Sequence, residues 1–174
     1  MMGRALLTVG AMATLGLIAT GVLGYLVADV GSAGLHLLIA LATCLLLLFS
    51  HCWIMFYLIG TGTAIKQAVA DEDLSPDLVE ETKELKNRSY PSLMLAIGLA
   101  MATFILGGGV DTGAIPSWLH QAMFLITLFV QLRTLWIEHL VLLDNATLMG
   151  RVEGLTAVSS TLPAAPEAVG EEDE

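Results

Sequence analysis

Four long apolar blocks are the feature of this chain that most constrains its fold. They cover residues 5–28, 35–60, 91–110 and 117–143, and each has about the 17–25 residues needed to cross the hydrocarbon core of a bilayer. Because a backbone in lipid must satisfy its own hydrogen bonds, each block is expected to be a helix. The sequence therefore predicts an all-α, polytopic membrane protein, with four transmembrane helices forming a bundle within residues 1–155.

The distribution of basic residues predicts the orientation. Arg4 precedes the first block, four basic residues lie in the loop 61–90, and Arg151 follows the fourth block, whereas the other two loops contain no Lys or Arg. The positive-inside rule then places both termini and the loop 61–90 in the cytoplasm. We expect a multi-pass protein of a bacterial inner membrane. The first block is longer than the h-region of about 7–15 residues in a signal peptide, so it is expected to be retained.

The connecting segments carry signals for helix ends. Ser75-Pro76 suits the start of a helix, and Pro91 is expected to stop it, which predicts a short cytoplasmic surface helix between the second and third spans. The glycine cluster 107–109 is expected to end the third span. In the first span, the small residues at four-residue spacing, Gly16, Thr20, Gly24 and Ala28, predict a face for close helix packing.

The excess of acidic over basic residues lies mostly outside the apolar blocks. The net charge of −10 argues against nucleic acid as a partner, because binding phosphates needs basic patches. The last residues are rich in Ala, Pro and Glu and contain no aromatic side chain. This composition predicts a disordered acidic tail over 156–174.

Four histidines lie within the expected spans, His36 and His51 in the second and His120 and His139 in the fourth. An ionisable side chain is costly at membrane depth, so each is a functional candidate. The two spans run parallel, and imidazoles facing each other across them could ligate b-type haem. The alternative for His36 and His120 is an ordinary place at a helix end. For His51 and His139, which lie deeper, the functional interpretation is favoured.

The same two spans carry polar residues at helical spacing. The two stripes consist of His36, Thr43, Ser50, Tyr57 and Thr61 in the second span and of His120, Thr127, Gln131, Thr134, Glu138 and Asn145 in the fourth. Lipid does not accept such a face, so the stripes are expected to turn toward each other. His51, His139 and Glu138 could then form a metal site, a proton relay or a quinone pocket, with Ser50, Gln131 and Thr134 in a proton path or in helix contacts.

Glu138 is the sharpest single candidate, because a carboxylate at that depth must be paired, ligated or protonated. Arg133 could balance its charge, but residues five apart on a helix point to different faces. Arg133 would then need a haem propionate, a lipid phosphate or another subunit as its partner. The alternative is that both residues only join helices.

Two weaker patterns are also present in the sequence. Cys44, His51, Cys52 and Met55 offer the sulfur and imidazole ligands that suit copper, although Cys and Met are also ordinary packing residues. The halves of the chain resemble each other around two short segments, Asp29, Gly31 and Leu35-His36 in one and Asp111, Gly113 and Leu119-His120 in the other. This pattern hints at an internal duplication, or at chance in a Leu-rich chain.

Three functions are compatible with these patterns. The first is a redox or electron-transfer subunit that binds haem or quinone between the second and fourth spans through the histidines, and any enzyme activity would then be that of an oxidoreductase subunit. The second is a cofactor-free accessory or structural subunit, in contact with other membrane subunits or with copies of itself. The third is a proton or ion pathway that uses Glu138 and His51.

Overall fold

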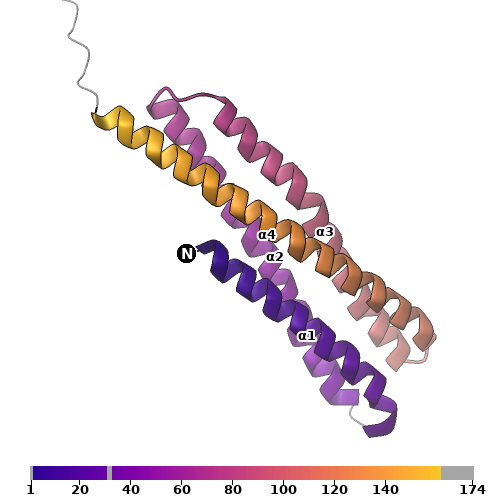
Figure 1. The fold of residues 1–174 in the computed structure, drawn as a ribbon. Helices are drawn as coiled ribbons and strands as arrows, with labels where there is room; N and C mark the ends of the chain where they lie inside the picture. Colours follow the sequence, from indigo (N-terminus) through magenta and orange to yellow (C-terminus); the bar gives the residue numbers. More distant parts are fainter. Residues whose placement is uncertain (1, 31–32, 162–174) are drawn as a thin grey trace, which may run out of the picture.

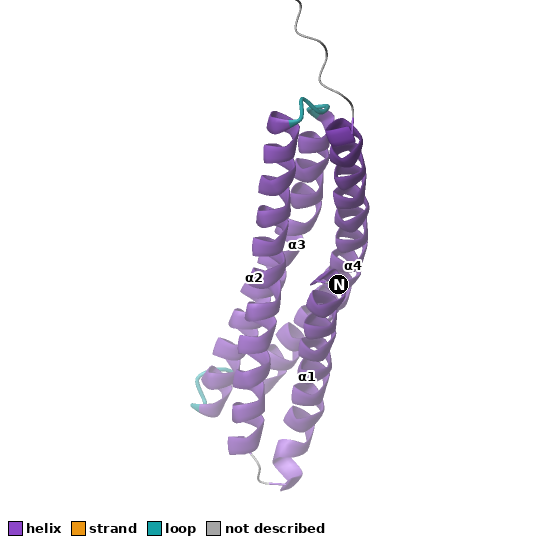
Figure 2. Ribbon diagram, turned by 90° about the vertical axis from the view of Figure 1, so that its left-hand side faces the viewer, coloured by secondary structure: helices purple, strands orange, loops and turns teal. Residues whose placement is uncertain are grey.

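The computed structural model of this chain describes residues 2–30 and 33–161, which form four α-helices (Figures 1 and 2). These are α1 (Met2–Val30), α2 (Ala33–Asp71), α3 (Asp77–Asp111) and α4 (Ser117–Thr161). The described residues contain no strand, and each helix is long and apolar enough to cross a membrane. The all-helical prediction is confirmed, and the four candidate spans indicate a multi-pass membrane protein.

The helices pack as two neighbouring hairpins, α1–α2 and α3–α4. Helices α2 and α4 each contact all three other helices, so they are the pair that meets across the middle of the molecule. The turn after α3 contains Gly113, and the turn after α2 contains Pro76, at the opposite end. We call these two ends the Gly113 end and the Pro76 end.

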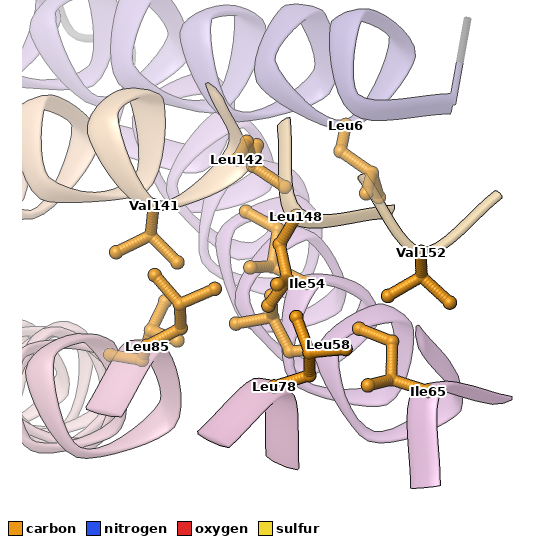
Figure 3. Packing of buried hydrophobic residues seen from close by; sticks show 11 residues of the cluster. Leu6, Ile54, Leu58, Ile65, Leu78, Leu85, Val141, Leu142, Leu148 and Val152 are labelled. Carbon is orange, nitrogen blue, oxygen red and sulfur yellow. The ribbon is translucent and has the colours of Figure 1, made fainter. Parts of the chain in front are cut away.

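Helix α1 is the shortest of the four, and its first turn lies beside the middle of α4 (Figure 1). The other three helices extend past it toward the Pro76 end. One apolar core runs from the four-helix part into this extension (Figure 3). It consists of Leu6, Ile54, Leu58, Ile65, Leu78, Leu85, Leu93, Val141, Leu142, Leu148 and Val152.

Exposed ion pairs lie across α3 and α4 in this extension. Arg88 pairs with Asp144, and Arg151 donates two hydrogen bonds to the carboxylate of Glu81, at 2.8 and 3.0 Å. These hydrogen bonds and the negative charge of Glu81 raise the pKa of the Arg151 guanidinium. Because exposed pairs are screened by water, they contribute little to stability.

The prediction of a separate surface helix stopped by Pro91 is not met. Helix α3 begins at Asp77 and continues through Pro91 to Asp111. A proline inside a helix frees the carbonyl four residues before it, here that of Asn87. Asn87 and Pro91 are both exposed, so groups outside the bundle can bond this carbonyl. The residues before Pro91 therefore form the first turns of the same helix that contains the third apolar block.

The glycine cluster 107–109 does not end α3 either. The helix continues to Asp111, where the backbone N–H of Thr112 bonds back to Gly108 and that of Gly113 to Val110, and Gly113 has a φ of +73°. This left-handed conformation is the one that favours glycine. Gly107 and Gly109 are instead places of close side-chain approach, to His120 and Ile115.

The predicted disordered tail is only partly covered by the structure. Helix α4 continues to Thr161, six residues beyond residue 155. Residues 162–174 lie outside the described residues, and for them the disordered tail stays a prediction.

Candidate functional site

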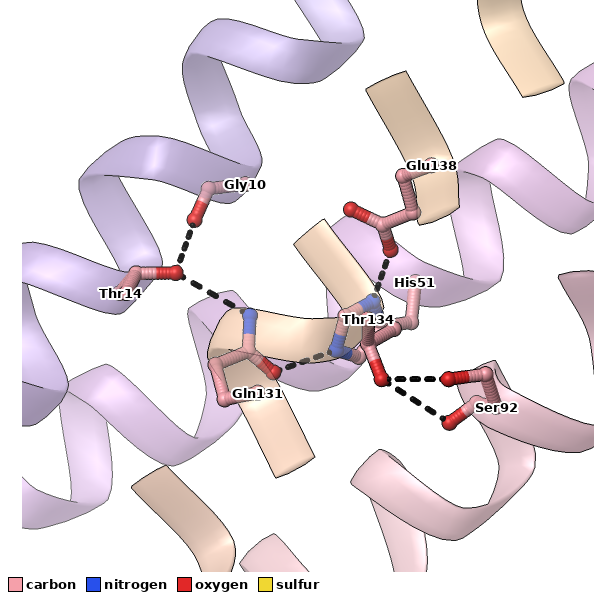
Figure 4. Close-up of polar contacts among 7 residues, drawn as sticks. All are labelled: Gly10, Thr14, His51, Ser92, Gln131, Thr134 and Glu138. Carbon is pink, nitrogen blue, oxygen red and sulfur yellow. Dashed lines mark hydrogen bonds and ion pairs between the residues drawn. The ribbon is translucent and has the colours of Figure 1, made fainter. Parts of the chain in front are cut away.

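A fully buried histidine lies at the centre of the molecule. His51 of α2 is 0% exposed, and both of its ring nitrogens face residues of α4. Its Nδ1 lies 2.6 Å from Oε1 of Glu138, and its Nε2 lies 2.9 Å from Oε1 of Gln131 (Figure 4). Gln131 and Glu138 are separated by two helical turns and so share one face of α4. One imidazole ring therefore joins α2 and α4 through two hydrogen bonds.

The hydrogen bonds continue from this ring to α1, and a separate hydroxyl pair joins α4 to α3 (Figure 4). Nε2 of Gln131 donates to Oγ1 of Thr14 at 3.1 Å, and Thr14 donates to the carbonyl of Gly10 at 2.9 Å, both on α1. On the other side, the hydroxyl oxygens of Thr134 and Ser92 of α3 are 2.7 Å apart. Together with His51 and Glu138, these five residues form what we call the buried network.

Two buried oxygens beside the network have no hydrogen-bond partner among the described residues. They are Oγ of Ser50 and Oε2 of Glu138. A methyl group added at Gly10 would lie 3.3 Å from the first and 3.4 Å from the second. Both oxygens therefore border the same narrow space next to α1.

The structure does not bring His139 or Arg133 into this site. His139 is half-buried on another face of α4, with its ring centroid 6.1 Å from that of Trp136, and Arg133 is exposed. Of the predicted metal ligands, the structure brings together only His51 and Glu138. No group of three or more His, Cys, Asp or Glu side chains in the described part of the chain could hold a metal ion.

The remaining two histidines line a cavity of about 330 Å³ between the helices, toward the Gly113 end. Its walls come from all four helices and include Leu17, Thr20, His36, Thr43, Ala100, Thr103, His120 and Thr127. We call it the histidine cavity. It lies on the Gly113 side of the buried network.

Each of the two hairpins contributes one pair of contacting threonines to the wall of the histidine cavity. In the first hairpin, the hydroxyl oxygens of Thr20 and Thr43 are 3.3 Å apart, and in the second, those of Thr103 and Thr127 are 2.6 Å apart. Thr103 follows Thr20 by 83 residues, and Thr127 follows Thr43 by 84. Each hairpin thus joins its two helices at an equivalent place.

The two histidines of the cavity and the glycines that they contact are related by the same sequence shifts, 84 residues from His36 to His120 and 83 from Gly24 to Gly107. A methyl group added at Gly24 would lie 3.1 Å from Cε1 of His36, and one added at Gly107 would lie 3.2 Å from Cε1 of His120. Nδ1 of each histidine is buried and has no hydrogen-bond partner among the described residues. These matching contacts support an internal duplication, in which the hairpins are parallel repeats around one shared cavity. Gly31, part of the sequence pattern that suggested it, lies outside the described residues.

The histidine cavity has little charge. Apart from its two histidines, the ionisable residues that line it are Tyr25, Cys44 and Asp111. Cys44 is half-buried in the wall, whereas Cys52 is exposed. The cavity is therefore a largely apolar space with two imidazoles and one carboxylate.

Gly21 and Phe124 face each other at the cavity wall, and Gly21→Ala tests this packing. The added methyl group would lie 2.3 Å from the Phe124 ring, so the ring must move and we expect the unfolding free energy to fall by about 1–3 kcal/mol. Gly98→Ala is the control, because no atom lies within 4 Å of the added methyl group. Unfolding measured in detergent should separate the two variants, and equal stabilities would contradict the observed packing.

Several residues of both sites were not singled out by the sequence. Thr14 and Ser92 are members of the buried network, and Thr103 and Gly107 line the histidine cavity. A signal for the last two existed, because they repeat Thr20 and Gly24 at a constant shift. Thr14 and Ser92 gave no signal, since a single hydroxyl in an apolar helix commonly bonds its own backbone.

No protein-family model matches the chain, and no match was found among curated proteins or among solved structures. What the chain does must therefore follow from the chemistry of the histidine cavity and the buried network.

Proposed function

We propose that this chain is the quinone-binding subunit of a membrane redox complex and that the quinone ring lies in the histidine cavity. The observation that carries the proposal is the placement of His36 and His120 at equivalent positions of two hairpins, against one largely apolar cavity. A quinone ring is flat and uncharged, with a carbonyl oxygen at each of two opposite ends. Each imidazole can donate one N–H to one carbonyl, so the symmetry of the ring matches that of the cavity.

The size and polarity of the cavity support this ligand. Its volume of about 330 Å³ lies at the small end of the range of about 300–1,000 Å³ for ligand pockets, which are mostly apolar with a few placed polar groups. A buried nitrogen without a hydrogen-bond partner is unfavourable by about 1–3 kcal/mol. A bound ring that lets the imidazoles reorient and bond its carbonyls would remove this penalty at both histidines.

Haem is the alternative ligand for the same two histidines, because two imidazoles can bind its iron from opposite sides. A haem carries two carboxylates, however, and these would need cationic partners. Among the residues that line the cavity, Asp111 is negative and none is Lys or Arg. The charge of the site therefore favours an uncharged ring over haem.

The proposed orientation follows from the basic residues. Arg88 and Arg151 lie in the extension at the Pro76 end, which the positive-inside rule places in the cytoplasm together with both termini. The histidine cavity then lies in the outer half of a bacterial inner membrane, where the tail of a lipid-soluble quinone can remain among the acyl chains. The electrons would come from a redox centre of a partner subunit, since imidazole and carboxylate groups do not supply them.

Cys44 gives a direct test, because it lines the cavity, and exposed Cys52 on the same helix is its internal control. The purified protein is treated with a maleimide, with and without a short-chain ubiquinone analogue, and each cysteine is followed by mass spectrometry. At a ligand concentration about ten times Kd, occupancy should slow the labelling of Cys44 about tenfold, because only the free protein reacts. Labelling of Cys52 should stay the same.

Two outcomes would overturn the quinone assignment. One is unchanged labelling of Cys44 at saturating quinone, which would leave the cavity without this ligand. The other is a Soret band in the visible spectrum of the purified protein that disappears in His36→Ala and His120→Ala variants. That result would assign the two imidazoles to haem iron instead.

A further inference from the structure

The hydrogen-bond pattern of the buried network determines where its protons lie. The single proton of the Thr14 hydroxyl goes to the carbonyl of Gly10, so Thr14 accepts from the amide of Gln131. The amide oxygen of Gln131 therefore faces Nε2 of His51 and accepts its N–H. Nε2 of His51 thus carries a proton whatever the state of its other nitrogen.

The second ring nitrogen shares one proton with the carboxylate. Nδ1 of His51 and Oε1 of Glu138 are 2.6 Å apart, and one proton is needed between them, on either atom. The pair is neutral overall in both arrangements, as an imidazolium with a carboxylate or as an imidazole with a carboxylic acid. Losing this proton would leave a buried net negative charge, which is strongly unfavourable in a low-dielectric interior.

The groups that face the pair from the packed helices are uncharged. They are Gly10 and Thr14 from α1, Ser50 from α2, Gln131 and Thr134 from α4, and, through Thr134, Ser92 from α3. Among these described neighbours no charged side chain compensates the pair. The unpartnered oxygens of Ser50 and Glu138 are the polar groups left to accept or pass on a proton.

The apolar layers on the two sides of the pair differ in thickness. Toward the Pro76 end lies the larger core, with Leu6, Ile54, Leu58, Val141 and Leu142 all buried. Toward the Gly113 end lies a smaller cluster of Ala13, Leu17, Leu47 and Ala100. Three of these four residues, Leu17, Leu47 and Ala100, also line the histidine cavity. On that side the apolar cluster is itself part of the cavity wall.

We propose that the His51–Glu138 pair is an internal proton-binding site that exchanges its proton with the histidine cavity and not with the Pro76 end of the molecule. The thin layer of Leu17, Leu47 and Ala100 acts as its barrier on the cavity side. The larger core closes the path on the other side. The site is therefore one-sided and does not form a continuous path across the membrane.

The role that we give to this proton-binding site rests on the proposed quinone-binding function. A quinone that is reduced takes up two electrons, here from the partner subunit, together with two protons. The pair can give its one proton to the ring in the cavity, becoming transiently anionic, and regain a proton from water that enters the cavity. A second transfer by the same route supplies the second proton, so both protons come from this water by way of the pair. The existence and sidedness of the site can be tested without any quinone, so its failure and that of the quinone assignment are distinguishable.

The test measures how fast the ring N–H of His51 exchanges with D2O, by NMR of the full-length protein labelled with 15N-histidine. Two buried residues of α2 on either side of His51 are truncated, Leu47→Ala toward the cavity and Ile54→Ala toward the Pro76 end. Both changes remove the same number of carbon atoms. We expect Leu47→Ala to speed the exchange about tenfold or more, because local opening that admits water from the cavity becomes easier. Ile54→Ala should leave the exchange rate nearly unchanged.

A second matched pair covers the case in which a leucine variant does not fold. Ala100→Gly thins the cavity side from α3, and Ala96→Gly, also buried, removes the same methyl group one turn nearer the Pro76 end. Faster exchange in Ala100→Gly alone supports the proposal. Equal exchange in both members of either pair, or faster exchange in Ile54→Ala or Ala96→Gly, overturns it.

Discussion

Glu138→Ala is expected to lower the unfolding free energy by about 3–5 kcal/mol, because removing one partner of a buried pair leaves the other uncompensated. Glu138 and His51 are both fully buried, and Nδ1 of His51 loses the oxygen that lies 2.6 Å away. Replacing both members by apolar residues, His51→Leu with Glu138→Leu, should recover part of this loss, since no polar atom of the pair then remains unpaired and only the amide oxygen of Gln131 loses its donor. The stabilities can be compared by unfolding in mixed detergent micelles.

Asp144→Ala is the control for this prediction, because Asp144 lies on the same helix and pairs with Arg88 across the surface. Its side chain is 53% exposed, so its loss should change the unfolding free energy by only about 0–1 kcal/mol. A Glu138→Ala variant as stable as Asp144→Ala would show that the His51–Glu138 contact does not form. A double variant no more stable than Glu138→Ala would show that the loss comes from packing and not from an unpaired charge.

His36→Ala and His120→Ala are each expected to weaken quinone binding about tenfold, because each removes one hydrogen bond of about 1.4 kcal/mol. The two side chains belong to different hairpins and bond opposite ends of the ring, so the effects should add to about 100-fold in the double variant. Affinity is measured by titration with the short-chain ubiquinone analogue, using protection of Cys44 as the signal.

His139→Ala is the matched control for these two variants. His139 lies on α4, as His120 does, but packs beside Trp136 outside the cavity. Its removal should leave the affinity unchanged. A single cavity histidine that accounts for the whole effect would contradict the symmetric placement of the ring, and an equal effect of His139→Ala would show that the histidine cavity is not the binding site.

The architecture of this protein could be predicted because it depends on local properties of the sequence. Long apolar blocks determine that helices form, since in lipid the backbone has no other partner. Helix ends were less predictable. Pro91 and the glycines 107–109 normally interrupt a helix, yet α3 continues through all of them, because packing against neighbouring helices outweighs the preferences of single residues.

The candidate site was predictable only in outline. The polar stripe of α4 identified Gln131 and Glu138 as buried candidates, because lipid does not accept polar faces, and His51 was a candidate as an ionisable side chain at membrane depth. The partner of His51 was not predictable. One residue of sequence separates Glu138 from His139 but turns the side chain by about 100° around the helix, and the crossing of α2 and α4 selects Glu138.

The sequence alone thus determined the number of long helices and which of their faces carry polar groups, because these follow from composition and from the helical period. Only the tertiary structure decided that His51 pairs with Glu138 and Gln131 and that His36 and His120 share one cavity. It also decided that Thr14 of α1 bonds Gln131 and that Ser92 of α3 pairs with Thr134 of α4. The physical reason is that such contacts depend on the rotation and depth of one helix relative to another. Packing of all four helices determines both at once, and no single segment contains that information.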